Sequence, residues 1–174
     1  NNDIGDTFGY SVAISGDTMA VGAPYEDSAQ TTITNGTTAS SDNSQEGNPW
    51  WLDGSGGAVY VYKRTGTTWA QEAYIKASNN DGLGSHTYEN YGSGVTLSGD
   101  TLAVATYGED SNQTTITMGT SASSDNSYVL AGAVYVYKRT GSSWAQEAYI
   151  KASNNVAALV FGSSADISGL TIVV

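Results

Sequence analysis

An internal repeat constrains this chain more than any other feature of its sequence. Residues 57–80 return as residues 132–155 with only two adjacent changes, both from threonine to serine. Upstream of each copy, residues 8–28 are similar to residues 91–111, and a third, shorter copy runs over residues 161–174. Recurrence at a period of roughly 70 to 80 residues is typical of repeat architectures. We therefore predict a fold that is built from successive copies of one small unit.

The copies divide the chain into three units. Unit 1 is residues 1–80, unit 2 is residues 81–155, and unit 3 is residues 156–174, which supply only the first two strands of a unit. Repeat units stack on their neighbours because one unit alone cannot bury its apolar face. We therefore expect the stacking of neighbouring units to form the core.

Each complete unit reads as four strands. Residues 58–63 alternate small or β-branched residues with tyrosine, which is the period of a half-buried strand. Gly16 and Asp17 form a tight-turn signal between the first two strands, and no segment has helical periodicity. The strands that we predict are 11–14, 19–21, 58–63 and 69–77 in unit 1, and 94–97, 102–105, 133–138 and 144–152 in unit 2. The fold class is therefore all-β, with antiparallel four-stranded blades of β-propeller type, two of them full and a third partial.

Two short motifs add a family resemblance. Residues 8–9 read FG and residues 22–24 read GAP, and this pair resembles the FG-GAP repeat of the integrin α-subunit head propeller. The downstream strands are similar to those of bacterial surface and secreted proteins that carry arrays of such repeats. Unit 2 departs from the motif at 91–92 and 105–107, while unit 3 keeps FG at 161–162. The resemblance implies an extracellular or cell-surface protein that takes part in adhesion or recognition.

Charge and composition exclude several functions. The 17 acidic and 6 basic residues give a net charge of −11, which argues against nucleic acid, because a phosphate binder needs a basic face. No apolar run approaches the roughly 18 residues of a membrane-spanning helix, so we expect no membrane insertion. Cysteine is absent, which excludes disulfides and thiol chemistry.

The acidic loops are the candidate metal site. Calcium takes about six to eight oxygen ligands, which carboxylates, amides and backbone carbonyls in loops can supply. The candidate ligands flank the segment between the second and third predicted strands of each unit: Glu26, Asp27, Asp42, Asn43, Glu109, Asp110, Asp125 and Asn126. The DxDxDG-like loop through which integrin-type repeats bind calcium is not present in the sequence. The alternative is that these residues make only local turn hydrogen bonds and keep the loops soluble.

Two features lie outside the repeat. Trp50 and Trp51 are either an aromatic contact surface for a glycan or protein partner, or a lid that packs over the blade. His86 is the single histidine, and no GxSxG or other nucleophile motif accompanies it. We therefore expect a protein without catalytic activity.

Repeated aromatic and basic residues have structural interpretations. Tyr60, Tyr62, Tyr135 and Tyr137 should pack between adjacent blades with their hydroxyls at an edge, and Trp69 and Trp144 should cap the blades. All six basic residues recur at matching positions, where we expect solvated strand ends that pair with local acids. Around Asn35 and Gly36, residues 31–38 predict a small polar hairpin that projects from the blade or lies along its neighbour.

The last predicted strand bears on assembly. Thr171, Ile172, Val173 and Val174 form an apolar edge whose partner strands are absent from unit 3. Propellers close with about four to eight blades, so we expect either a part of a longer propeller or copies that complete one another. Three functions remain open. They are adhesion to a surface protein or glycan, head-to-tail self-association into a fibre, and a calcium-stabilised carbohydrate-binding module.

Overall fold

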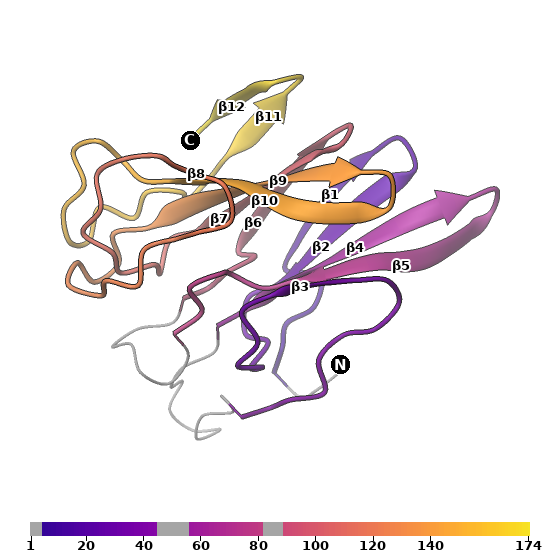
Figure 1. The fold of residues 1–174 in the computed structure, drawn as a ribbon, viewed down its shortest axis with the longest axis horizontal. Helices are drawn as coiled ribbons and strands as arrows, with labels where there is room; N and C mark the ends of the chain where they lie inside the picture. Colours follow the sequence, from indigo (N-terminus) through magenta and orange to yellow (C-terminus); the bar gives the residue numbers. More distant parts are fainter. Residues whose placement is uncertain (1–4, 45–55, 82–88) are drawn as a thin grey trace.

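The computed structural model describes residues 5–44, 56–81 and 89–174, and these residues form two five-stranded antiparallel sheets and one two-stranded sheet (Figure 1). The described residues contain no helix, which confirms the all-β prediction. It follows that no described segment has the long apolar helix that a membrane crossing would need. The sheets are consistent with propeller-type blades, and the described sheets do not close into a ring.

Unit 1 forms the first five-stranded sheet, in the order β1-β2-β4-β5-β3. Gly16 takes a positive φ of 57° in the turn between β1 and β2, the backbone region that glycine adopts without steric cost. Its strands are β1 (Ser11–Ser15), β2 (Thr18–Ala23), β3 (Ile33–Asn35), β4 (Ala58–Thr65) and β5 (Thr68–Ile75). The four strands predicted from the sequence are therefore present, with slightly different ends.

Unit 2 repeats this sheet in the order β6-β7-β9-β10-β8. Its strands are β6 (Gly94–Ser98), β7 (Thr101–Thr106), β8 (Thr117–Met118), β9 (Ala133–Thr140) and β10 (Ser143–Ile150). Unit 3 contributes only a hairpin, β11 (Asp166–Ser168) and β12 (Thr171–Val173). All three sheets lie within the units read from the sequence, although the unit boundaries themselves stay predictions.

The fifth strand of each sheet replaces the predicted polar hairpin. Instead of folding back on itself, the segment sends β3 antiparallel along the outer edge of β5, with Ile33 opposite Ile75. Gly36 then turns the chain away with a φ of 113°, and its N–H donates to the Glu72 carbonyl at 2.7 Å. The Gln71 side chain holds the departing segment by donating to the Thr38 carbonyl at 2.8 Å. The hairpin prediction was wrong because a ready-made sheet edge offers this segment more backbone hydrogen bonds than a second short arm could.

Each sheet has two faces with different roles. We call the side of unit 1 that carries Ala20, Val59, Val61, Ala73 and Ile75 its rear face, and the opposite side its front face. The rear face of unit 1 packs on the front face of unit 2, and together they form the largest buried cluster. The rear face of unit 2 packs in turn on the unit 3 hairpin through Val134, Phe161 and Ile172. Most of the core therefore lies in the joints between units, while Ala23, Ala58, Tyr60 and Tyr74 form a smaller cluster within unit 1.

The strand register separates two ends of the molecule. The β1–β2 and β4–β5 turns lie together, because Thr18 pairs with Lys63 and Thr65 pairs with Thr68. The long connection from β2 to β4 starts at the opposite end, where Ala23 pairs with Ala58. Unit 2 repeats the arrangement, so the tight turns share one end and the long connections share the other (Figure 1).

Candidate functional site

A buried ion pair lies at the base of the long connection in each unit. The Lys76 ammonium lies 2.7 Å from the Glu26 carboxylate in unit 1, and neither side chain is exposed. Lys151 and Glu109 make the same pair in unit 2. Burial lowers the pKa of both lysines, and the paired carboxylates oppose that shift. The expectation that all the basic residues lie at solvated strand ends was therefore wrong for these two lysines, because the loops close over them.

Each pair is the centre of a small polar network. In unit 2 the Tyr149 hydroxyl donates to Glu109 Oε1 at 2.6 Å, and the Ser111 N–H donates to Oε2 at 3.1 Å. In unit 1 the Ser28 N–H donates to Glu26 at 3.3 Å. These donors fix the first residues of each long loop to the sheet. Two of the candidate calcium ligands are thus bound to lysines and backbone groups.

Glu89 adds an uncompensated acid to the unit 2 network. It is 2% exposed, and neither of its carboxylate oxygens has a hydrogen-bond partner among the described residues. Burial raises its pKa well above the usual 4.5, and the charges of Glu109, Asp81 and Asp110 raise it further, while Lys151 acts in the opposite direction. Its counterpart in unit 1 is Asp6, which precedes Phe8 as Glu89 precedes Tyr91 and is also buried.

Two further acids of the candidate calcium set, exposed Asp42 and partly buried Asp125, organise the loop backbone. Asp42 accepts hydrogen bonds from the N–H groups of Ala29 and Ser44, both at 3.0 Å, and Asp125 does the same for the N–H groups of Asn112 and Ser127 at 3.0 and 3.1 Å. Backbone donation at Ala29 is the main reason that the pKa of Asp42 is lowered, and the Asn112 N–H has the same effect on Asp125. These contacts are the local turn bonds of the alternative interpretation.

The remaining candidate ligands are divided between buried and partly buried positions. Asp110 is buried and accepts from the Leu130 N–H at 2.8 Å, Asp27 is also buried, and Asn43 and Asn126 are partly buried. Among residues 5–44, 56–81 and 89–174, no three acidic or histidine side chains form a group that could hold a metal ion. Calcium therefore stays a prediction. Trp50, Trp51 and His86 lie outside the described residues.

The predicted assembly edge is exposed. Within the described chain β12 pairs with β11 alone, so its other edge meets no strand. Leu170 is 91% exposed and Val173 is 66% exposed, while Ile172 turns toward the rear face of unit 2. Intermolecular pairing through this edge remains a prediction.

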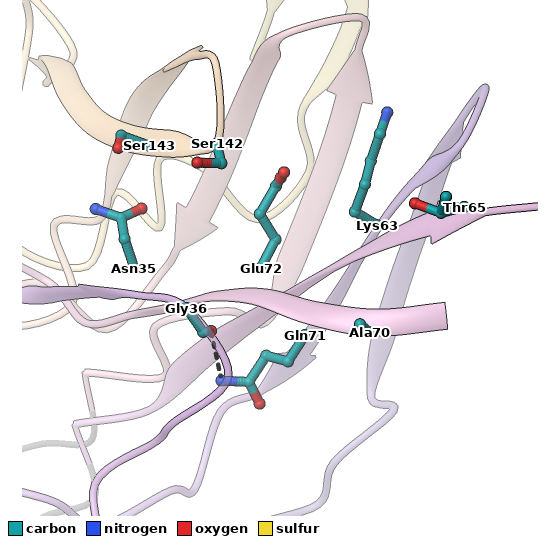
Figure 2. Close-up of a pocket in the computed structure, with 9 residues that line it drawn as sticks. All are labelled: Asn35, Gly36, Lys63, Thr65, Ala70, Gln71, Glu72, Ser142 and Ser143. Carbon is teal, nitrogen blue, oxygen red and sulfur yellow. Dashed lines mark hydrogen bonds between the residues drawn. The ribbon is translucent and has the colours of Figure 1, made fainter. Parts of the chain in front are cut away.

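A polar hollow of about 350 Å³ opens between units 1 and 2 near the tight-turn end (Figure 2). It is lined mainly by Asn35, Lys63, Gln71, Glu72, Ser142 and Ser143. Amide, carboxylate and hydroxyl groups on its walls could bind a hydroxylated ligand. Two of them, Asn35 and Glu72, already contact unit 2.

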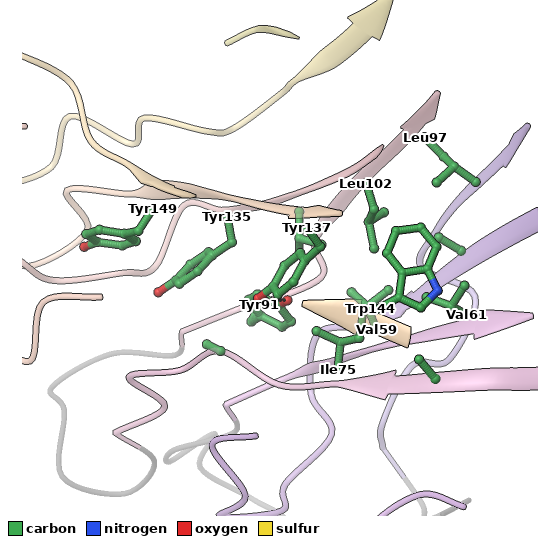
Figure 3. Packing of buried hydrophobic residues seen from close by; sticks show 14 of the residues in the cluster. Val59, Val61, Ile75, Tyr91, Leu97, Leu102, Tyr135, Tyr137, Trp144 and Tyr149 are labelled. Carbon is green, nitrogen blue, oxygen red and sulfur yellow. Dashed lines mark hydrogen bonds between the residues drawn. The ribbon is translucent and has the colours of Figure 1, made fainter. Parts of the chain in front are cut away.

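The joint between the units combines aromatic packing with polar contacts across it. Figure 3 shows the tyrosines of unit 2 in a row, followed by Trp144 against Val61 and Ile75 of unit 1. The Glu72 carboxylate accepts from Trp144 Nε1 at 3.0 Å and lies 3.2 Å from the Arg139 guanidinium. Trp144 therefore joins two units rather than capping one blade.

Two asparagines of unit 1 complete the joint. The Asn35 side chain accepts from the Trp144 N–H at 2.8 Å and donates to the Trp144 carbonyl at 3.4 Å. The Asn79 amide donates to Glu109 at 3.3 Å and accepts from the Tyr135 hydroxyl. Thus Tyr135 packs between blades as predicted, but its hydroxyl ends inside the joint and not at an edge. Nothing in the repeat alone distinguishes these asparagines from ordinary loop residues.

The fold and the joint define a class of protein, namely stacked antiparallel repeat units of propeller-blade type with long loops at one end. Comparison with known families then identifies the repeat, because residues 3–41 match the family model of the FG-GAP repeat. The match spans β1, β2 and β3 of unit 1, including the FG and GAP motifs. Residues 3–41 therefore carry an FG-GAP repeat, which confirms for this segment the resemblance seen in the sequence. No curated protein matches the chain.

Proposed function

We propose that this chain is a non-enzymatic adhesion or recognition protein of the cell surface or the extracellular space. The observation that carries the proposal is that the long connections of units 1 and 2 leave their sheets at the same end, each fixed at its base by an equivalent buried lysine–glutamate pair. Rigid scaffolds that hold variable loops side by side are a common way to build a binding surface. The FG-GAP repeat, which the integrin head also uses, supports the same role.

The chemistry of the loops suggests a polar partner. Most of the loop residues that the structure describes as exposed have hydroxyl or amide side chains, among them Thr37, Thr38 and Ser41 in unit 1. Such groups exchange hydrogen bonds with hydroxyls and amides, as on a glycan or a protein surface. The net charge of −11 opposes binding to nucleic acid.

The test is a binding screen of the purified chain against immobilised glycans and cell-surface proteins. Thr37→Lys combined with Thr38→Lys alters the exposed part of the unit 1 connection that follows β3 and should abolish binding to the partner found, while Thr67→Lys in the β4–β5 turn serves as the control. Trp50→Ser with Trp51→Ser should also abolish binding if these residues form a contact surface. Equal binding by both lysine variants would contradict recognition through the loops.

A second candidate function is structural. The exposed edge of β12 and the exposure of Leu170 favour head-to-tail strand pairing between copies, because an open apolar edge is a template for another strand. Ile172→Pro removes a backbone donor within β12 and should prevent assembly while units 1 and 2 stay folded. Light scattering and negative-stain images distinguish the outcomes, since a strict monomer at high concentration contradicts this candidate.

A further inference from the structure

The buried pair of Lys151 and Glu109 in unit 2 places an amine directly against a carboxyl group. The Lys151 side chain is 0% exposed and that of Glu109 is 1% exposed, and Nζ of the lysine contacts Oε2 of the glutamate. Lys151 directly follows β10, and Glu109 lies at the start of the long connection that follows β7. An amine and a carboxyl group held together in this way are the two reactants of an amide bond.

Three further donors hold the Glu109 carboxyl group in place. The Tyr149 hydroxyl donates to Oε1 at 2.6 Å, and the Asn79 amide donates to the same oxygen at 3.3 Å. The Ser111 N–H donates to Oε2 at 3.1 Å. Donors fixed on a carbonyl oxygen stabilise the negative charge that develops there when a nucleophile adds to the carbon. Asn79 comes from unit 1, so the joint between the units completes this set of donors.

Burial removes the main obstacle to a reaction between these two groups. In water both groups are charged, and an ammonium group has no lone pair with which to attack a carbonyl carbon. A buried site disfavours both charges, which favours transfer of a proton from Lys151 to Glu109 and gives a neutral amine beside a neutral carboxyl group. Contact between the two groups also gives an effective concentration far above that of free reactants. Position and environment therefore both favour condensation.

We propose that Lys151 and Glu109 join in an isopeptide bond that forms within the folded chain. Lys151 Nζ attacks Glu109 Cδ, and the Nζ–Cδ bond forms as the Cδ–Oε2 bond breaks. The two protons that the ammonium group loses both go to Oε2, which leaves as water. Oε1 remains as the amide carbonyl and keeps its hydrogen bond from Tyr149. One ammonium and one carboxylate thus become one neutral amide and one water, without any change in oxidation state.

The bond ties the end of β10 to the start of the long connection in unit 2. Glu109 and Lys151 are 42 positions apart, so the bond closes a loop of the chain that contains β8, β9 and β10. A pull on the connection is then carried by a covalent bond in place of an ion pair. The bond leaves the exposed loop residues of the proposed function unchanged, and it removes Glu109 from the candidate calcium ligands.

Peptide mapping of the purified chain tests the bond. Trypsin does not cut after a lysine whose amine is acylated, so most molecules should yield residues 140–174 as one fragment joined to the fragment that contains Glu109. The joined fragments should be about 18 Da lighter than the sum of their sequence masses, because one water is lost. Fragmentation by mass spectrometry should place the link between Lys151 and Glu109. Lys151→Arg keeps the charge in a guanidinium that stays protonated, so this control should give separate fragments at full mass.

Two results would overturn the proposal. The first is that most of the unsubstituted protein yields residues 140–151 and 152–174 as separate fragments at full mass. The second is a loss of water that persists in Lys151→Arg, which would place the dehydration elsewhere in the chain. The digest of the unsubstituted protein is decisive even if Lys151→Arg does not fold. Neither result bears on binding by the loops, so the proposed function is tested separately.

Discussion

Replacing each repeated tryptophan by alanine tests the joint quantitatively. Trp144→Ala removes a side chain that is 2% exposed, and large-to-alanine changes of this kind cost about 3–5 kcal/mol. It also removes the indole N–H that donates to Glu72 at 3.0 Å, which places the cost toward the upper end. Trp69→Ala removes a ring that is 38% exposed, so its smaller buried area predicts a loss of about 1–2 kcal/mol.

The two variants make a matched pair, because the strands around both tryptophans have nearly the same sequence. Thermal unfolding followed by far-UV circular dichroism should show a drop in Tm of roughly 6–20 °C for Trp144→Ala, at about 2–4 °C per kcal/mol for a chain of this size. The Trp69→Ala variant, by the same conversion, should melt roughly 2–8 °C below the parent. Equal losses would refute the reasoning, since local strand structure alone would then determine both.

Three further predictions concern pH, backbone and metal. The pKa of Glu89 is raised in the folded state, so the folded chain binds the Glu89 proton more tightly than the unfolded chain does. The stability that results is present at low pH. It is lost as the pH rises above the ordinary pKa of 4.5 and through the raised pKa of the folded state. Glu89→Gln should therefore raise the Tm at neutral pH and flatten its pH dependence, and an unchanged profile would contradict this. Gly132→Ala should detach unit 3, because the φ of Gly132 is +81° and the added Cβ would lie 1.9 Å from the backbone oxygen of Phe161. In Gly141→Ala the added Cβ meets open space, so this variant should lose only about 1 kcal/mol of stability from the strain of its positive φ. Hydrogen exchange in β11 and β12 separates the two variants, and equal protection would contradict the clash. If the acidic loops bind calcium, millimolar calcium should raise the Tm, and Asp27→Ala with Asp110→Ala should abolish the increase. Identical melting with calcium and with chelator would argue against a site.

The sequence was sufficient for the strands because their signal is local. Alternation over residues 58–63 and the glycine turn at Gly16 need no knowledge of the rest of the chain, and both appear where they were predicted. The stacking of units followed from the repeat itself. The strands and the turn depend on residues that are close in sequence, so a single sequence is enough to predict them.

What failed depends on contacts between distant residues. β3 forms because the edge of β5 lies beside it, and Lys76 is buried because a loop that starts 50 positions away carries Glu26. Asn35 and Trp144 are 109 positions apart. Residue type gives no hint of such partners, so the sequence could not show that Lys76 would be buried against Glu26.

The bulge in β5 has an evolutionary consequence. The register shift between β4 and β5 accompanies Glu72, whose side chain faces unit 2. Arg64 and Trp69, the unit 1 equivalents of the pair that receives Glu72, lie on the opposite face of unit 1. A gene duplication of one whole unit therefore copies both halves of a joint at once, and the new neighbour arrives with its contacts already in place. Unit 2 has Met118 where unit 1 has Asn35, so a duplicated unit 2 would pass on a joint with one amide fewer. Duplication of unit 1 would therefore preserve more of the contacts between units than duplication of unit 2.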